Sequence, residues 1–340
     1  MELSVEEALQ GDYILIDLRS EKEYGLSHIP FAASLPLLDD EARAIVGFAY
    51  KQISREEAFK LGLDHVLPKL DFLKKGIDKL LEKKEVVLYC SRGGMRSSSV
   101  YKLYAHDNRV HLLEGGYKAY RKFILDKMPS EIEKRDFLVF QGLTGVGKTR
   151  ILQELAADYN VLDLELLASH RGSVFGGLGL DEQPSQKQFQ NDIFSFLYST
   201  EGLILVESES SKIGKLLLPK EIRSKILTSP LFLIEAPMDY RVKFLEEDYG
   251  VKLRENKDEL IEDIWMLKSQ LGSEACSELA ELLERDEMAR AIELLLINYY
   301  DPLYRHSMKT SEERLLFTFD ASKEDVTREI GRKINEILYS

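Results

Sequence analysis

A glycine-rich loop in the middle of the chain constrains the fold more than any other feature. Residues 142–149 read GLTGVGKT, with the apolar run 136–140 before them and the helix-forming run 150–158 after them. In this pattern, backbone amides surround a diphosphate, the lysine neutralises its charge and the threonine reaches a Mg²⁺ ion. The strand and helix on either side supply the context that the motif requires. We therefore expect a P-loop α/β domain that binds phosphate through Gly142, Gly145, Gly147, Lys148 and Thr149.

A second pattern of strand, loop and helix surrounds Cys90. The apolar run 86–89 precedes it, the following loop carries two glycines and two arginines, and residues 97–104 favour a helix. Loop amides, a helix N-terminus and the arginines all favour a thiolate over a thiol. Cys90 is therefore a candidate nucleophile, with Arg92 and Arg96 beside it. The alternative is a small buried residue at the end of a strand, where most free cysteines lie.

The length of 340 residues favours two domains. Strands alternate with helices in both halves, which predicts parallel α/β sheets in each. We expect a first domain over 1–128, a polar linker with a proline over 129–135, and a second domain over 136–340. The second domain is expected to contain a helical insertion over 238–298 and to end in a strand and a helix.

Composition narrows the class of protein. A net charge of −13 opposes indiscriminate binding to nucleic acid. Two cysteines exclude a disulfide framework and a cysteine-based zinc cluster. The chain starts without a leader-like segment and has no long apolar run, so we expect a cytoplasmic protein that makes no membrane contact.

Several polar residues outside the two loops are further candidates, each with a structural alternative. His170, Arg171 and Ser173 form a loop suited to an anion, although a lone histidine is more often structural. Glu207 ends the buried run 203–207 and suits a Mg²⁺ ion or a water molecule, or else a solvated strand end. Glu209 follows it and, like Glu207, is a candidate contact for an anion or RNA.

Two further groups suit an RNA. The dense basic stretch 212–225, with Lys212 and Lys215, is either a binding surface for RNA phosphates or a solvated face. Tyr300 and Arg305 belong to an aromatic and basic cluster that suits base stacking, although packing is the commoner use of such rings.

The first domain resembles the rhodanese family of sulfurtransferases, which carry a persulfide on cysteine. The resemblance rests on Asp17-Leu18-Arg19, residues 28–32, the Cys90 loop and residues 113–117. Five residues separate Cys90 from Arg96, as in rhodanese-like phosphatases, whereas small rhodaneses have four. Tyr89 stands where those phosphatases usually have histidine, which argues against a phosphatase.

The whole chain resembles the tRNA 2-selenouridine synthase family. The matching segments are residues 36–41, 46–47 and 50–52, the Cys90 loop, 114–117, 142–149, 170–173, Glu207, 209–210, 213–214 and 300–305. Two positions depart from the pattern, because Ser208 and Ser211 stand where the family has an acidic residue and an arginine.

The resemblance implies a two-step modification of wobble 2-thiouridine in the anticodon loop of tRNA. Geranyl diphosphate first alkylates the sulfur, and selenium from selenophosphate then replaces the S-geranyl group. Cys90 would carry the selenium while Arg92 and Arg96 stabilise its anion, and the phosphate loop would hold the diphosphate. A Mg²⁺ ion at Thr149 and Glu207 fits this scheme, which needs no tightly bound cofactor. The expected partners are tRNA and the enzyme that supplies selenophosphate, and the chain is expected to act as a monomer.

Two other functions remain open at this point. One is a sulfurtransferase or phosphatase with a nucleotide-regulated P-loop domain. The other is an NTP-driven RNA-binding switch in which the rhodanese domain is only a scaffold. The sequence leaves open whether the phosphate loop holds geranyl diphosphate, ATP or GTP, and which side chains surround the geranyl chain.

Overall fold

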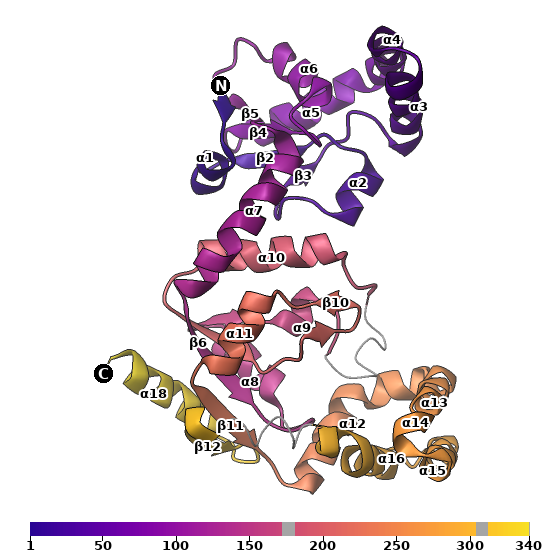
Figure 1. The fold of residues 1–340 in the computed structure, drawn as a ribbon, viewed down its shortest axis with the longest axis vertical. Coiled ribbons are helices and arrows are strands. Elements are labelled where there is room, and N and C mark those ends of the chain that lie inside the picture. Colours follow the sequence, from indigo (N-terminus) through magenta and orange to yellow (C-terminus); the bar gives the residue numbers. More distant parts are fainter. Residues whose placement is uncertain (172–180, 304–311, 340) are drawn as a thin grey trace. The chain divides into compact units, whose positions relative to one another are not determined.

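The computed structural model describes residues 1–171, 181–303 and 312–339, and it divides into two compact units (Figure 1). The first unit comprises Met1–Pro129 and Pro184–Ser195, and the second comprises Ser130–Gln183 and Phe196–Ser340. Each unit is built around its own five-stranded parallel sheet. This confirms the predicted α/β class with two parallel-sheet domains.

The sheet of the first unit has the strand order β1-β5-β4-β2-β3. Its strands are β1 (Glu2–Leu3), β2 (Ile14–Asp17), β3 (Ala33–Ser34), β4 (Val86–Tyr89) and β5 (Val110–Leu113). β4, the strand that leads to Cys90, is central as predicted. Both β4 and β5 are buried along their whole length, which is typical of a parallel sheet covered by helices on both faces.

Seven helices and a 3-10 turn belong to this part of the chain. They are α1 (Val5–Gln10), α2 (Glu21–Leu26), α3 (Asp40–Gln52), α4 (Arg55–Val66), the turn η1 (Leu67–Lys69), α5 (Leu70–Leu81), α6 (Met95–Leu103) and α7 (Gly116–Glu133). α5 and α6 pack against β4. The sequence predicts a helix over 97–104, and α6 begins two residues earlier, at Met95.

α7 corrects the predicted linker. The sequence predicts a polar linker with a proline stop over 129–135. The two units do divide after Pro129, but α7 continues through this proline and ends at Glu133. Tyr120, Ile124, Met128 and Ile132 follow one another at intervals of one helical turn, and all are buried. Burial of this continuous ridge outweighs the hydrogen bond that Pro129 cannot donate.

Residues 184–195 pack with the first unit, whereas the sequence places all of 136–340 in the second domain. They include most of α10 (Gln186–Ser199). Asn191 of this helix is fully buried, and its side-chain amide donates to the His28 carbonyl (2.7 Å) and to the Tyr117 hydroxyl (3.0 Å). Arg121 donates to the Asn191 side-chain oxygen, so the predicted boundaries need amendment at this segment.

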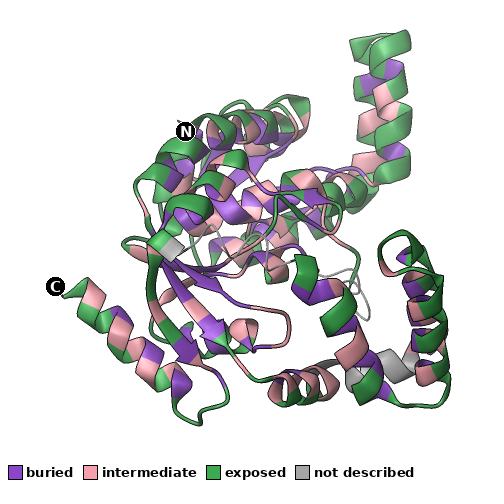
Figure 2. Cartoon of the chain, turned by 60° about the horizontal axis from the view of Figure 1, so that its bottom comes forward, coloured by how far each residue is buried: buried purple, intermediate pink, exposed green. Residues whose placement is uncertain are grey.

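The sheet of the second unit has the order β12-β11-β6-β8-β7. Its strands are β6 (Asp136–Gln141), β7 (Asn160–Leu162), β8 (Leu203–Glu207), β11 (Leu231–Glu235) and β12 (Leu315–Asp320). Central β6 and its neighbour β8 are almost wholly buried (Figure 2). A separate hairpin joins β9 (Lys212–Ile213) to β10 (Leu216–Leu217). The carboxyl ends of β6 and β8 lie side by side, which sets the position of the site that they carry.

Helices α8 (Lys148–Leu155), α9 (Leu164–Leu167), α11 (Lys220–Thr228) and α18 (Val326–Leu338) accompany this sheet, and the turn η3 (Glu312–Arg314) precedes β12. A helical lobe, defined here as residues 238–300, confirms the predicted insertion. It consists of α12 (Met238–Glu255), α13 (Lys257–Met266), α14 (Lys268–Leu271), α15 (Ser273–Glu284), α16 (Met288–Leu295) and the π-helical turn η2 (Leu296–Tyr300). Among the described residues, no helix has the length and apolarity needed to cross a membrane.

Candidate active sites

Cys90 lies at the carboxyl end of β4, in a loop held by a second glycine turn. Gly93 has a φ of 63° and Gly116 a φ of 58°, values that favour glycine. A Cβ on Gly116 would lie 2.2 Å from the Cys90 carbonyl oxygen, so the two loops approach too closely for any side chain. The Tyr117 amide donates to that carbonyl over 2.9 Å. Both glycine turns are therefore needed to hold the loop.

The Cys90 sulfur lies close to the start of α6. Only 3% of the Cys90 surface is exposed, whereas Arg92, Gly94 and Met95 are exposed. The sulfur is 3.2 Å from the Ser97 hydroxyl oxygen, and its thiol donates to the Gly94 carbonyl over 3.8 Å. A hydroxyl at the first turn of a helix stabilises a sulfur anion. The sulfur is therefore nearly inaccessible in this structure, although exposed residues follow it in the loop.

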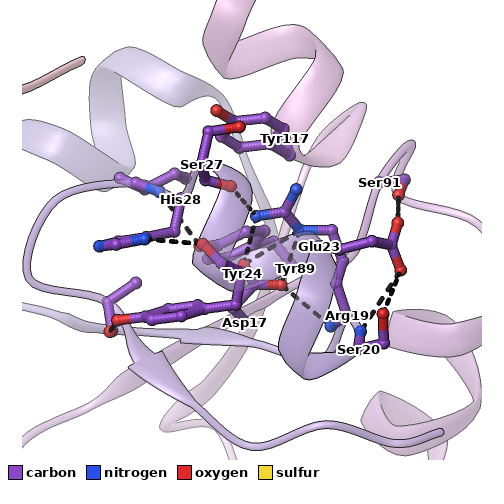
Figure 3. Close-up of polar contacts among 12 residues, drawn as sticks. Asp17, Arg19, Ser20, Glu23, Tyr24, Ser27, His28, Tyr89, Ser91 and Tyr117 are labelled. Atoms are coloured by element: carbon purple, nitrogen blue, oxygen red, sulfur yellow. Dashed lines mark hydrogen bonds and ion pairs between the residues drawn. The ribbon is translucent and has the colours of Figure 1, made fainter. Parts of the chain in front are cut away.

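Arg96, predicted to stabilise the anion on Cys90, is paired with a carboxylate that the sequence analysis missed. Its guanidinium donates to Glu23 of α2 over 2.7 Å and to the Ser91 hydroxyl over 3.0 Å. Ser91 in turn donates to Glu23 over 2.8 Å (Figure 3). Arg43 of α3 lies 2.7 Å from the same carboxylate. Much of the charge of Arg96 is thus already neutralised within the unit, which leaves Arg92 as the exposed cation of the loop.

This pairing also sets the protonation of Glu23. Burial raises the pKa of its carboxyl, but the Arg96 hydrogen bond and charge, the Ser91 hydroxyl and Arg43 together lower the pKa to about 2. Glu23 is therefore ionised at neutral pH. It opposes entry of a phosphate dianion beside Arg96, which weighs against the phosphatase alternative.

A buried network around Arg19 connects the end of β2 to the end of α2 and to α7 (Figure 3). Arg19 donates to both oxygens of Asp17 and to the Ser27 carbonyl, and its guanidinium lies 4.0 Å from the centre of the Tyr117 ring. Asp17 and Arg19 are almost fully buried. A paired charge at such depth is well satisfied, so the motif at residues 17–19 has a structural role here.

The phosphate loop connects β6 to α8 as predicted. Gly145 and Gly147 have φ values of 82° and 84°, and α8 begins at Lys148. The Lys148 ammonium folds back over the loop, 3.1 Å from the Gly142 carbonyl oxygen and 3.4 Å from a carboxylate oxygen of Glu207. The Thr149 hydroxyl donates to the other carboxylate oxygen of Glu207 over 3.1 Å. β6, β8 and α8 thus bring the predicted phosphate-binding and metal-binding residues together.

Three carboxylates meet beside this loop. Ligand oxygens of Glu165, Glu207 and Glu209 lie within 4.8 Å of one another. The pKa values of Glu165 and Glu209 are both raised. Burial is the largest cause, and repulsion from Glu207 is the second. Glu165, in the first turn of α9, was not among the predicted site residues. The only signal for it was its place among the carboxylates that follow the run 160–162.

A cavity of about 460 Å³ opens at this site and has two chemically different ends. Its polar end is lined by Lys148, Thr149, Arg171 and the three carboxylates. Its apolar end enters the helical lobe and is lined by Phe244, Leu245, Leu260, Leu283, Met288, Ala291, Ile292, Leu295, Leu296 and Tyr300. A volume of this size is typical of small-ligand sites. Arg150, Gln153, Ser208 and Glu247 of α12 also line the cavity.

Arg241 of the helical lobe pairs with Asp301 and also contacts the phosphate loop. Arg241 of α12 donates to both carboxylate oxygens of Asp301, over 2.6 and 3.0 Å, and to the Thr144 carbonyl over 2.8 Å. Both charged side chains are almost fully buried. The apolar wall is therefore fixed relative to the phosphate-binding end of the same cavity.

The other predicted residues have different positions. His170 follows α9, burial lowers its pKa, and its buried Nδ1 has no hydrogen-bond partner within the described residues. Arg171 and Tyr300 line the cavity, whereas Lys212 and Lys215 are exposed on the β9–β10 hairpin. Ser173 and Arg305 lie outside the described residues. The predicted anion site around His170 is thus seen only in part.

Comparisons with known proteins agree with this arrangement. Residues 135–335 match the model of the tRNA 2-selenouridine synthase AAA domain, and residues 4–123 match the rhodanese-like domain. The tRNA 2-selenouridine synthase of Marinobacter nauticus is 32% identical over 90% of this chain and 91% of its own length. That of Hydrogenovibrio crunogenus is 34% identical over 93% and 95%. The chain therefore belongs to the tRNA 2-selenouridine synthase family.

Proposed function

We propose that this protein is a transferase that converts wobble 2-thiouridine of tRNA into 2-selenouridine through an S-geranyl intermediate. Its substrates are the anticodon loop of a thiolated tRNA, geranyl diphosphate and selenophosphate, the last delivered by the enzyme that makes it. The observation that carries this proposal is the cavity at the phosphate loop, whose polar end continues into an apolar end.

The shape of this cavity favours an alkyl diphosphate over a nucleotide. A nucleoside needs hydrogen-bonding partners for its sugar and base, and a buried polar group without a partner is costly. The helical-lobe residues that line the cavity are aliphatic or aromatic apart from the exposed Glu247 of α12 and the hydroxyl of Tyr300. A hydrocarbon chain needs no such partners and gains free energy from burial against this wall.

The first step is alkylation of the tRNA sulfur. The sulfur of 2-thiouridine attacks C1 of geranyl diphosphate, a sulfur–carbon bond forms, the carbon–oxygen bond breaks, and N3 of the base releases its proton to water. Lys148 and the loop amides stabilise the departing diphosphate. The oxygens of Glu165, Glu207 and Glu209, with the Thr149 hydroxyl, fit a Mg²⁺ ion, which would neutralise diphosphate charge.

The second step replaces the alkylated sulfur. The Cys90 thiolate takes selenium from selenophosphate: a sulfur–selenium bond forms, the selenium–phosphorus bond breaks and phosphite leaves. The terminal selenium then attacks C2 of the base, a carbon–selenium bond forms and geranylthiolate leaves. A cellular thiol next attacks the Cys90 sulfur, which breaks the sulfur–selenium bond and leaves selenium on the base, and a second thiol reduces the resulting mixed disulfide. The loop amides, the Ser97 hydroxyl and Arg92 stabilise the anion on the carrier.

Mass analysis of nucleosides tests the proposal. Thiolated tRNA is incubated with the full chain, a thiol reductant and both donors, or with each donor omitted in turn. We expect 2-selenouridine with both donors and S-geranyl-2-thiouridine when selenophosphate is omitted. Selenouridine formed equally well without geranyl diphosphate would contradict the proposed order of steps.

A further inference from the structure

α16 contributes one face to the apolar end of the cavity. Met288, Ala291, Ile292 and Leu295 recur at the spacing of a single helical face, and all four line the cavity. They also belong to the buried core of the helical lobe. Ala289 of the same helix lies outside this face and is exposed.

Ala291 is the smallest side chain among the described apolar residues that line the cavity, and it is 1% exposed. Its neighbours on α16 are large, and Leu260 of α13 and Leu283 of α15 line the same cavity. The space beside Ala291 therefore exists because this position lacks a longer side chain. A longer side chain at this position would fill that space, because the surrounding core residues cannot make room for it without repacking.

We propose that Ala291 sets the length of the hydrocarbon chain that the cavity accepts. This inference rests on the proposed function, in which the phosphate loop holds the head of an allylic diphosphate. A larger side chain at this position would occupy the volume that the far part of a geranyl chain requires. It would leave room for the shorter dimethylallyl chain and would leave the diphosphate end untouched.

Apolar pockets discriminate between chain lengths by a known amount. One methylene that a pocket admits or rejects changes relative affinity by roughly 10- to 200-fold. Leucine adds an isobutyl-sized volume at Ala291, so a loss of geranyl affinity of about tenfold or more follows. Valine adds less and should give an intermediate loss.

Equilibrium titration of the full chain tests this inference. The variants are Ala291→Val, Ala291→Leu and the matched control Ala289→Leu on the exposed face of α16. Each is titrated with geranyl diphosphate, dimethylallyl diphosphate and inorganic diphosphate. We expect graded loss of geranyl diphosphate affinity at position 291, with the other two ligands within about twofold of wild type, and no change in the control.

Three outcomes have distinct meanings. Unchanged geranyl diphosphate affinity in Ala291→Leu overturns the inference, and so does equal loss of all three ligands in both position 291 variants. Wild-type protein that binds inorganic diphosphate and ATP but not geranyl diphosphate refutes the proposed function itself. That last result is obtained without any variant, so the two failures are distinguishable.

Discussion

The Cys90 loop and the phosphate loop use the same local architecture for different purposes. Each is a glycine-containing loop at the carboxyl end of a central parallel strand, and each leads into a helix. At Cys90 the reactive residue is almost fully buried, and Glu23 pairs with Arg96. At Lys148 the loop borders a cavity of about 460 Å³ that extends into the helical lobe.

The difference shows how the size of the ligand is set by what surrounds the loop. The glycine turn at 115–116 and α2 close the first loop, so it suits a small group held on sulfur. The helical lobe opens beside the second loop, so it suits a diphosphate with a long chain. The two sites therefore predict separable effects on the two proposed steps.

The largest separation is expected from Cys90→Ser. Without the sulfur no selenium carrier forms, so selenation of pre-geranylated tRNA falls by about 10³-fold or more. Geranylation of thiolated tRNA is unchanged. Quantitative nucleoside mass analysis measures both steps, and Cys276→Ser, at the buried cysteine of the lobe, serves as the control. Selenation retained in Cys90→Ser would eliminate the carrier role.

Lys148→Ala should show the reverse pattern. Loss of the ammonium that neutralises the departing diphosphate lowers the geranylation rate by about 10²- to 10³-fold. Selenation of pre-geranylated tRNA keeps its wild-type rate. Single-turnover kinetics on each tRNA substrate measures the effect, with exposed Lys220→Ala as the control. An equal loss in both steps would mean that the two sites are not separable.

Loss of the carboxylate at Glu207 tests the metal proposed at the second site. Because Glu207 accepts from Thr149 and lies beside Lys148, Glu207→Gln is expected to lower geranylation roughly 10- to 100-fold. Chelation of divalent cations should give a similar loss in wild type and little further loss in the variant. Exposed Glu201→Gln is the control. Full geranylation in the presence of a chelator would refute the metal.

The smallest effect concerns stability at the first site. The pKa of Glu23 is about 2 in the folded chain, below its ordinary value of 4.5, so the folded state binds the proton more weakly. The resulting stabilisation is present above about pH 4.5 and is lost as pH falls towards 2. After a discount for partial exposure, Glu23→Gln should cost about 1–2 kcal/mol at neutral pH and little at low pH.

Urea unfolding at several pH values measures this difference, and exposed Glu21→Gln in the same helix is the control. Curves for wild type and Glu23→Gln should converge as the solution is acidified. A constant difference between them across the whole pH range would show that Glu23 does not act through its charge.

The sequence predicts local features well because their determinants are local. The glycines, the apolar runs and the Gly-Lys-Thr signature are contiguous, and both loops have the predicted context of strand and helix. Residues that reach a site from elsewhere carry no such signal. Glu23 precedes Cys90 by more than sixty positions, and its sequence signature is that of a helix capping residue.

The wall of the cavity was also beyond prediction, for a different reason. Residues such as Leu283 and Ala291 have the spacing and composition of an ordinary helix core, and most of them are core residues. Only their three-dimensional arrangement shows that they border a space. The same applies to residues 184–195, because their polar contacts with Tyr117 and Arg121 are distant in sequence.

Competition between labelled geranyl diphosphate and ATP on the full chain tests the central claim most directly. We expect saturable binding of geranyl diphosphate that inorganic diphosphate displaces and ATP does not, and that Lys148→Ala weakens. Tight binding of ATP with none of the prenyl donor would contradict the account.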